Sequence, residues 1–181
     1  MSDRQTELLE LLDRSGPSLF ALLTRLTLRQ DAAEELMQEL FLRLSDGDNH
    51  VGIECLGAYA RRTAINLAFD WRRRKRRRET VPLDIVAEPL SQMPGPLADV
   101  VAAEEIEQIL NAVGRLNGLS RQAFVMRYIQ QDSYEAIAEQ LGKTPHHVRA
   151  MCFRATQQVR DLVGGNHSPA KGKEAENAEQ P

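Results

Sequence analysis

The chain has 181 residues, and its 23 lysine and arginine residues against 26 aspartate and glutamate residues give a formal net charge of -3. A charged fraction of 27% and a hydrophobic fraction of 42% are typical of a soluble globular protein. No run of about 18 apolar residues is present to cross a bilayer, and the N-terminus has no secretory signal pattern. We therefore expect a cytoplasmic protein without membrane insertion.

The charge is unevenly distributed along the chain. Residues 1–60 contain 5 basic and 11 acidic residues, whereas residues 61–80 contain 9 basic and 2 acidic ones. Such a block indicates a polyanionic partner there and a different partner elsewhere. The two cysteines, Cys55 and Cys152, lack the spacing of a disulfide framework or a zinc knuckle, so we expect both to be reduced.

Apolar residues recur every three or four positions from residue 5 to about residue 44, which predicts helices. Gly16 and Pro17 predict a break inside this stretch, and the polar residues 45–49 predict a second one. The helical pattern resumes over residues 56–78. We predict a first helical domain over residues 5–78.

The second half of the chain predicts another helical domain after a linker. Residues 79–99 are rich in proline and glycine and have little periodicity, which predicts an extended linker. Helical spacing returns over residues 100–163, and residues 164–181 have the composition of a disordered tail. The expected fold is all-α, with two small helical domains joined by an extended linker.

The most specific local pattern lies at residues 133–163 and predicts a helix-turn-helix. Ser133 is a good N-cap for a short helix, Gly142 permits a tight turn, and Thr144 followed by Pro145 begins the next helix. In DNA-binding proteins the start of this second helix meets base edges in the major groove. The alternative is a helical hairpin whose polar face is solvated.

The side chains at the start of this second helix are the candidate readers of DNA: Thr144, His146, His147, Arg149 and Arg154. The two adjacent histidines point about 100° apart on a helix and no third ligand is evident, so no metal site is expected.

Residues 72–78 are seven consecutive basic residues, preceded by the aromatic residues Tyr59, Phe69 and Trp71. A phosphate backbone would relieve the repulsion among the cations, and aromatic rings beside cations suit unpaired bases. Alternatively, the aromatic residues belong to the core and the basic run is a solvated or localisation-type cluster.

Residues 31–44 predict an amphipathic helix with an acidic face. Leu36, Met37, Leu40, Phe41 and Leu44 form the predicted buried stripe, with polar side chains opposite: Glu35, Gln38 and Glu39. An acidic face is unsuited to DNA. It is either a solvated surface or a docking face for a basic protein.

These three motifs, in their order along the chain, resemble the extracytoplasmic-function (group IV) sigma factors, the smallest class of sigma-70-type initiation factors of bacterial RNA polymerase. The resemblance covers roughly residues 19–163. DAAEELMQELFLRL at 31–44 resembles region 2.2, and AINLAFDWRRR at 64–74 resembles regions 2.3 to 2.4. The segment at 116–163 resembles region 4, including its helix-turn-helix.

The resemblance implies a role for each candidate residue. Glu35, Gln38 and Glu39 match the face that docks on the clamp coiled coil of the polymerase β′ subunit, and the β flap is a further polymerase contact. The helix that begins at Pro145 matches the reader of the minus-35 element. The residues that match the capture of the melted minus-10 strand are Arg61, Arg62, Asn66, Asp70, Trp71, Arg72, Arg73 and Arg74.

The implied partners are core RNA polymerase, promoter DNA and an anti-sigma factor, and no cofactor is expected. The chain departs from the family at Met151, where many relatives have a basic residue, so one DNA contact is expected to be lost. Residues 46–59 also lack the usual tryptophan before region 2.3, where Tyr59 could substitute.

Two other classes of function fit the sequence less well. A free-standing helix-turn-helix regulator would bind duplex DNA alone, usually as a dimer, but it does not explain the acidic helix at 31–44. An enzyme is not expected, because the sequence has no nucleophile beside a base and no glycine-rich phosphate loop.

Overall fold

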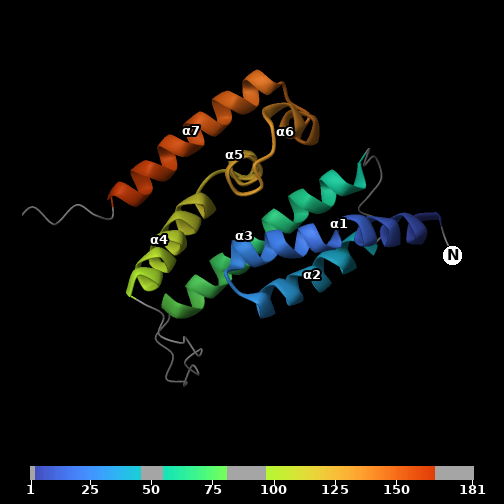
Figure 1. The fold of residues 1–181 in the computed structure, drawn as a ribbon, viewed down its shortest axis with the longest axis horizontal. Coiled ribbons are helices and arrows are strands. Elements are labelled where there is room, and N and C mark those ends of the chain that lie inside the picture. The colour runs from blue at the N-terminus through green and yellow to red at the C-terminus, as the bar shows by residue number, and fades with distance from the viewer. Residues whose placement is uncertain (1–2, 46–54, 81–96, 166–181) are drawn as a thin grey trace, which may run out of the picture.

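The computed structural model describes residues 3–45, 55–80 and 97–165. All regular structure in these ranges is helical, which confirms the all-α prediction (Figure 1). The elements are α1 (Asp3–Thr27), α2 (Gln30–Ser45), α3 (Leu56–Thr80), α4 (Leu97–Gly114), α5 (Gly118–Phe124), the π-helical segment η2 (Val125–Ile129), α6 (Tyr134–Leu141) and α7 (Pro145–Gly164).

Helices α1, α2 and α3 form the N-terminal unit, in which each helix packs against the other two (Figure 1). Their shared core is aliphatic and almost completely excluded from solvent. Its largest fully buried side chains are Leu23, Leu26, Leu36, Leu40, Leu44, Ile65 and Leu67. Burying such side chains is the main stabilising term for a small helical unit.

The predicted break at Gly16 and Pro17 is wrong, because α1 continues through both residues. A proline inside a helix removes one backbone hydrogen bond and costs about 3 kcal/mol. The helix nevertheless persists because Leu8, before the proline, and Leu19, after it, are both buried in the same core. Tertiary packing therefore outweighs the local preference of Pro17.

The buried stripe of α2 is narrower than the sequence predicted. Leu36, Leu40 and Leu44 are buried, whereas Phe41 is 36% exposed and Met37 is only partly buried. Residues four apart stay on one side of a helix, and each neighbouring residue is rotated by about 100°. The prediction that Phe41 is a core residue is therefore wrong.

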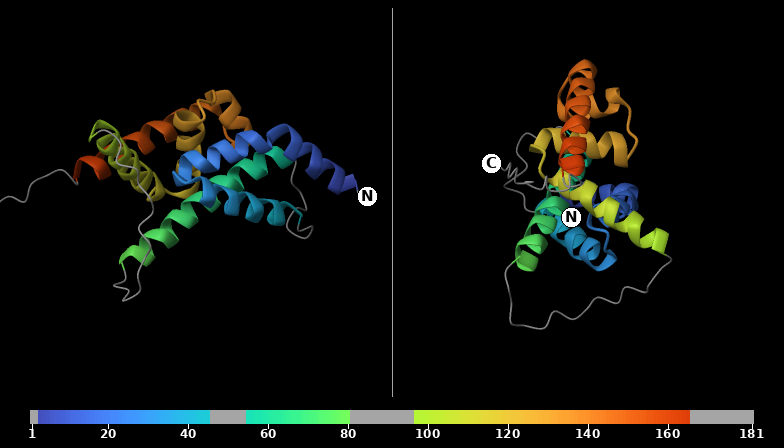
Figure 2. Two further views of the ribbon diagram at one scale, coloured as in Figure 1. Left: turned by 60° about the horizontal axis from the view of Figure 1, so that its bottom comes forward. Right: turned by 90° about the vertical axis from the view of Figure 1, so that its left-hand side faces the viewer.

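Helices α4 to α7 form the C-terminal unit, in which α7 packs against α4, α5 and α6 (Figure 2). The sequence analysis missed the π-helical segment η2, where the amide of Gln130 donates to the carbonyl of Val125 at 3.0 Å. The predicted linker at 79–99 and tail at 164–181 fall mostly outside the described residues. Where they are described, α3 extends to Thr80 and α4 begins at Leu97.

The predicted helix-turn-helix is confirmed. Ser133 Oγ accepts from the amide of Ala136 at 3.1 Å and caps α6, and Gly142 ends that helix with a φ of 62°. Thr144 Oγ1 accepts from the amide of His147 at 3.2 Å, which caps α7 directly before its first residue, Pro145.

Replacing Gly142 by alanine should destabilise the protein by about 1 kcal/mol, because a Cβ disfavours the left-handed conformation. No atom within 4 Å would obstruct the new Cβ, so the effect reports backbone strain alone. Thermal denaturation checks this. Gly118→Ala is the matched control, since Gly118 also has open space but no positive φ. Equal melting temperatures for the two variants would contradict the assigned strain.

Candidate nucleic-acid interface

The predicted docking residues lie on the outer face of α2. Glu35 and Gln38 are exposed, and Glu39 is partly exposed and forms an ion pair with Arg43, with Oε1 and Nη2 separated by 2.6 Å. Leu42 adjoins them and is 68% exposed. This face therefore combines carboxylates with an exposed apolar side chain.

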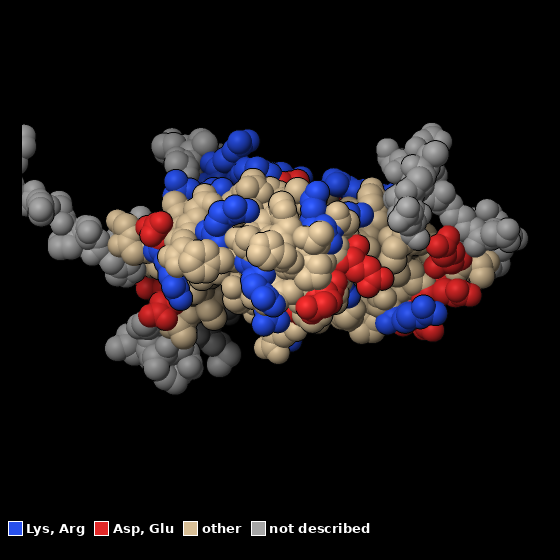
Figure 3. All heavy atoms as spheres, turned by 90° about the horizontal axis from the view of Figure 1, so that it is seen from above, with Lys and Arg blue, Asp and Glu red and all other residues tan. Residues whose placement is uncertain are grey.

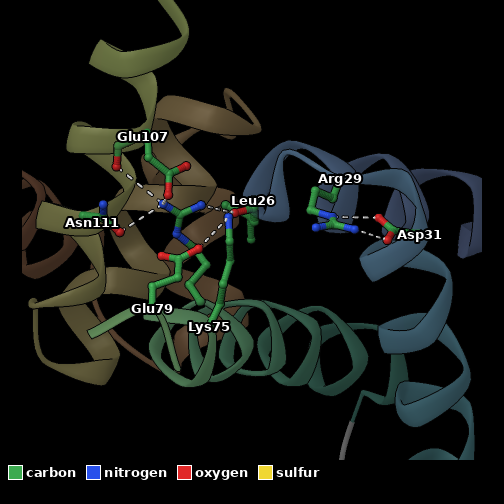
Figure 4. Close-up of polar contacts among 8 residues, drawn as sticks. Leu26, Arg29, Asp31, Lys75, Glu79, Glu107 and Asn111 are labelled. Carbon is green, nitrogen blue, oxygen red and sulfur yellow. Dashed lines mark hydrogen bonds and ion pairs between the residues drawn. The ribbon is translucent and has the colours of Figure 1, made fainter. Parts of the chain in front are cut away.

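The first turn of α2 carries a further negative charge. A side-chain hydrogen bond from Arg29 lowers the pKa of Asp31 to about 2, so this carboxylate is ionised at neutral pH (Figure 4). Its position suits the partial positive charge at a helix N-terminus.

The predicted strand-capture residues all lie on α3 but differ in their surroundings. Arg61 and Asn66 are partly buried against the C-terminal unit. Asp70 forms an ion pair with Arg73, while Arg73 and Arg74 are exposed. The structure thus places these residues on one helix without presenting all of them to solvent.

Arg72 is the exception within the basic run, because it is 7% exposed whereas Arg74, Arg77 and Arg78 are exposed. Its guanidinium donates to the carbonyl of Leu26 at 3.3 Å and contacts the side chains of Glu107 and Asn111 of α4, which Figure 4 labels. A continuous basic sequence therefore gives an exposed cationic surface with one cation turned inward.

Phe69 is a core residue, as predicted by the alternative interpretation in which the aromatic residues before the basic run belong to the core. It is 3% exposed and lies beneath the guanidinium of Arg121, with 5.2 Å between that group and the ring centroid. The Phe69 ring is therefore shielded from solvent in this structure. Tyr59 and Trp71 are partly exposed, and Lys75 Nζ lies 5.8 Å from the Trp71 ring centroid.

All five candidate readers around the start of α7 are exposed: Thr144, His146, His147, Arg149 and Arg154. The guanidinium of Arg149 lies 5.1 Å from the ring centroid of Tyr134, on which Arg127 also stacks at 4.5 Å. Met151, in contrast, is 5% exposed and faces the core. Viewed from above, basic groups are interspersed with uncharged and acidic ones rather than forming one continuous patch (Figure 3).

Within the described ranges, no three histidine, cysteine, aspartate or glutamate side chains are grouped so that they could hold a metal ion. None of the described helices is both long and apolar enough to cross a membrane.

Sequence patterns did not predict the polar residues of the C-terminal unit that form hydrogen bonds or ion pairs with α3. They are Glu107, Asn111, Arg121, Gln122 and Asp132. Isolated polar residues on amphipathic helices give no sequence signal of a distant partner, so only the tertiary structure reveals this set.

Comparison with known families matches residues 11–78 to the family described as sigma-70 region 2 and residues 106–159 to sigma-70, region 4. A similar solved structure is the sigma factor RpoE in complex with the anti-sigma factor NepR from Bartonella quintana. It is 21% identical, has a TM-score of 0.47, and the match covers 91% of this chain and 98% of that one. No curated protein gave a significant match.

A helical N-terminal unit that matches region 2 and a helix-turn-helix unit that matches region 4 define a transcription initiation factor. The chain belongs to the sigma-70 family. It is a sigma factor that directs transcription initiation, and its partners are RNA polymerase and promoter DNA.

Proposed function

We propose that this sigma factor belongs to the extracytoplasmic-function group and divides promoter recognition between its two units. The acidic face of α2 docks on the β′ clamp coiled coil, α3 captures the melted minus-10 strand, and α7 reads the minus-35 element. The protein acts in the cytoplasm and has no catalytic activity of its own, because the polymerase performs the chemistry. An anti-sigma factor holds it inactive, as the resemblance to the group implies.

The main support for this proposal is that opposite charges lie on two different helices of the N-terminal unit. The docking face of α2 presents Glu35 and Glu39, whereas the exposed part of α3 presents Arg73, Arg74 and the basic residues after them. A basic protein surface and a nucleic acid can therefore be bound at the same time on different faces.

The test of the proposed function uses purified protein and bacterial core RNA polymerase on a sizing column, followed by transcription from a pool of genomic promoters. A stoichiometric complex that initiates at a shared pair of minus-35 and minus-10 elements would support the proposal. Absence of a complex, together with tight binding of duplex DNA by the protein alone, would instead favour a free-standing regulator.

Arg149→Ala should reduce promoter-specific initiation by about 10-fold or more, because a good side-chain contact to a base contributes roughly 1–3 kcal/mol of discrimination. Binding to core polymerase should stay unchanged, since Arg149 is exposed on the other unit. Run-off transcription with competing promoters measures the first quantity, and co-elution measures the second. Arg160→Ala, on an exposed side chain about three turns further along α7, is the matched control. Unchanged promoter selectivity in Arg149→Ala would exclude Arg149 as a reader.

A further inference from the structure

The side of α3 that carries the predicted strand-capture residues is partly covered by the C-terminal unit of the same chain. Helices α4 and α5 both pack on α3 (Figures 1 and 2). Three of the predicted capture residues, Arg61, Asn66 and Arg72, have polar partners in the C-terminal unit. Arg61 and Arg72 are eleven residues apart, so these contacts extend over about three helical turns.

The first two contacts involve residues between α4 and α6. The guanidinium of Arg61 forms an ion pair with Asp132 across 2.9 Å. Asn66 Oδ1 accepts hydrogen bonds from Arg121 at 3.3 Å and from Gln122 at 3.4 Å. While these contacts persist, Nη1 of Arg61 and Oδ1 of Asn66 are engaged by the C-terminal unit, although both residues are only partly buried.

The third contact is the most deeply buried. Arg72 Nη2 lies 2.9 Å from a carboxylate oxygen of Glu107 and donates to Asn111 Oδ1 at 3.1 Å, both residues of α4 (Figure 4). Beside it the ring of Phe69 lies against Gly114, where an added Cβ would approach the ring to 3.3 Å. Polar and apolar contacts therefore hold α4 on α3 together.

Some buried hydrogen-bond donors at this interface have no acceptor. In the described part of the chain, Nε of Arg72 and Nε of Arg121 are buried without a hydrogen-bond partner. Burial lowers the pKa of Arg121, whose guanidinium donates to the neutral oxygens of Asn66 and Gly114. Buried donors without partners lower the stability of the state that buries them, and rehydration on separation would remove this cost.

We propose that the arrangement is a self-closed state in which the C-terminal unit and the single-stranded minus-10 DNA compete for the same side chains of α3. Opening then precedes strand capture, and it releases Arg61, Asn66 and Arg72 to phosphates and unpaired bases. This inference rests on the proposed role of α3 in the preceding subsection.

The closed state can be disrupted from the side that does not bind DNA. Asp132→Ala combined with Glu107→Ala removes both carboxylate partners and leaves α3 intact. Gly114→Leu is an independent steric variant, because its side chain would displace the Phe69 ring, and leucine favours a helix more than glycine does. The matched control is Glu104→Ala with Glu139→Ala, which removes two exposed carboxylates of the same unit.

The first measurement is the distance between spin labels on the exposed Cys55 and on a cysteine introduced at the exposed Gln157; Cys152 is buried and stays unlabelled. The parent and the control should give one narrow distribution, and both disrupted variants should give longer and broader ones. A broad distribution in the parent, or unchanged distributions in both disrupted variants, would overturn the proposal.

The second measurement is the affinity of each free protein for a fluorescent single-stranded oligonucleotide of mixed sequence at fixed salt. If the parent is closed about 90% of the time, opening should raise the apparent affinity about tenfold. Opening without any gain in affinity would overturn the competition. Failure of the parent to bind core polymerase would refute the proposed function and would leave the distance comparison valid.

Discussion

Glu35→Lys combined with Gln38→Lys should weaken binding to core RNA polymerase by at least about 100-fold, or roughly 2.7 kcal/mol. Both side chains are exposed on α2, so the change places two cations on a face that is predicted to meet a basic coiled coil. Like charges brought together at an interface cost several kcal/mol. Fluorescence titration of labelled protein with core polymerase measures the loss, and circular dichroism should show an unchanged helix content.

The chain offers a closely matched control for this double substitution. Gln158 and Asp161 are also an amide and a carboxylate three residues apart, and both are exposed, but they lie on α7. Changing both to lysine alters the net charge by the same amount. If the α7 pair weakens polymerase binding as much as the α2 pair, the effect is one of overall charge, and the docking face is assigned wrongly.

Arg72→Ala should lower the free energy of unfolding by roughly 2 kcal/mol, because it leaves the buried carbonyl of Leu26 without this donor, whereas the Glu107 side chain is 41% exposed and can be rehydrated. The affected groups are Glu107 and Asn111 on α4 and the carbonyl of Leu26 at the end of α1. Arg74→Ala, two residues along the same basic run but exposed, should change stability by no more than about 0.5 kcal/mol. Urea denaturation of the two variants gives the comparison directly.

The same pair of variants should behave differently in DNA binding. Arg74→Ala should reduce the slope of log affinity against log salt concentration for single-stranded DNA by the amount expected for the loss of one phosphate contact. The fold should not change. If Arg72→Ala and Arg74→Ala have the same free energy of unfolding, whether lowered or unchanged from the parent, the buried position of Arg72 is contradicted.

Much of the fold follows from short-range patterns. Ser133, Gly142 and Thr144 act through hydrogen bonds or backbone angles within four residues of themselves. The helix-turn-helix can therefore be located from those residues alone. The acidic face of α2 follows in the same way, because a residue's neighbours at three and four positions decide whether a helix face is polar.

Predictions that depended on distant neighbours were less successful. The expected break at Pro17 ignored the two buried leucines that hold the helix together on either side of it. Phe41 was assigned to the core of α2, although its rotation about the helix axis leaves it 36% exposed. In both cases the outcome depended on which side of the helix packs against its neighbours.

The sequence by itself determined the two helical units, the capped second helix of the helix-turn-helix and the separation of acidic from basic segments, since each is encoded by residues close together in the chain. Only the tertiary structure decided that Arg72 is turned inward among seven consecutive cations, that Phe69 is covered, and that Asn66 faces Arg121. Neighbouring residues of a helix point about 100° apart, and which direction meets another helix is set by packing between segments some 40 to 70 residues apart in the chain.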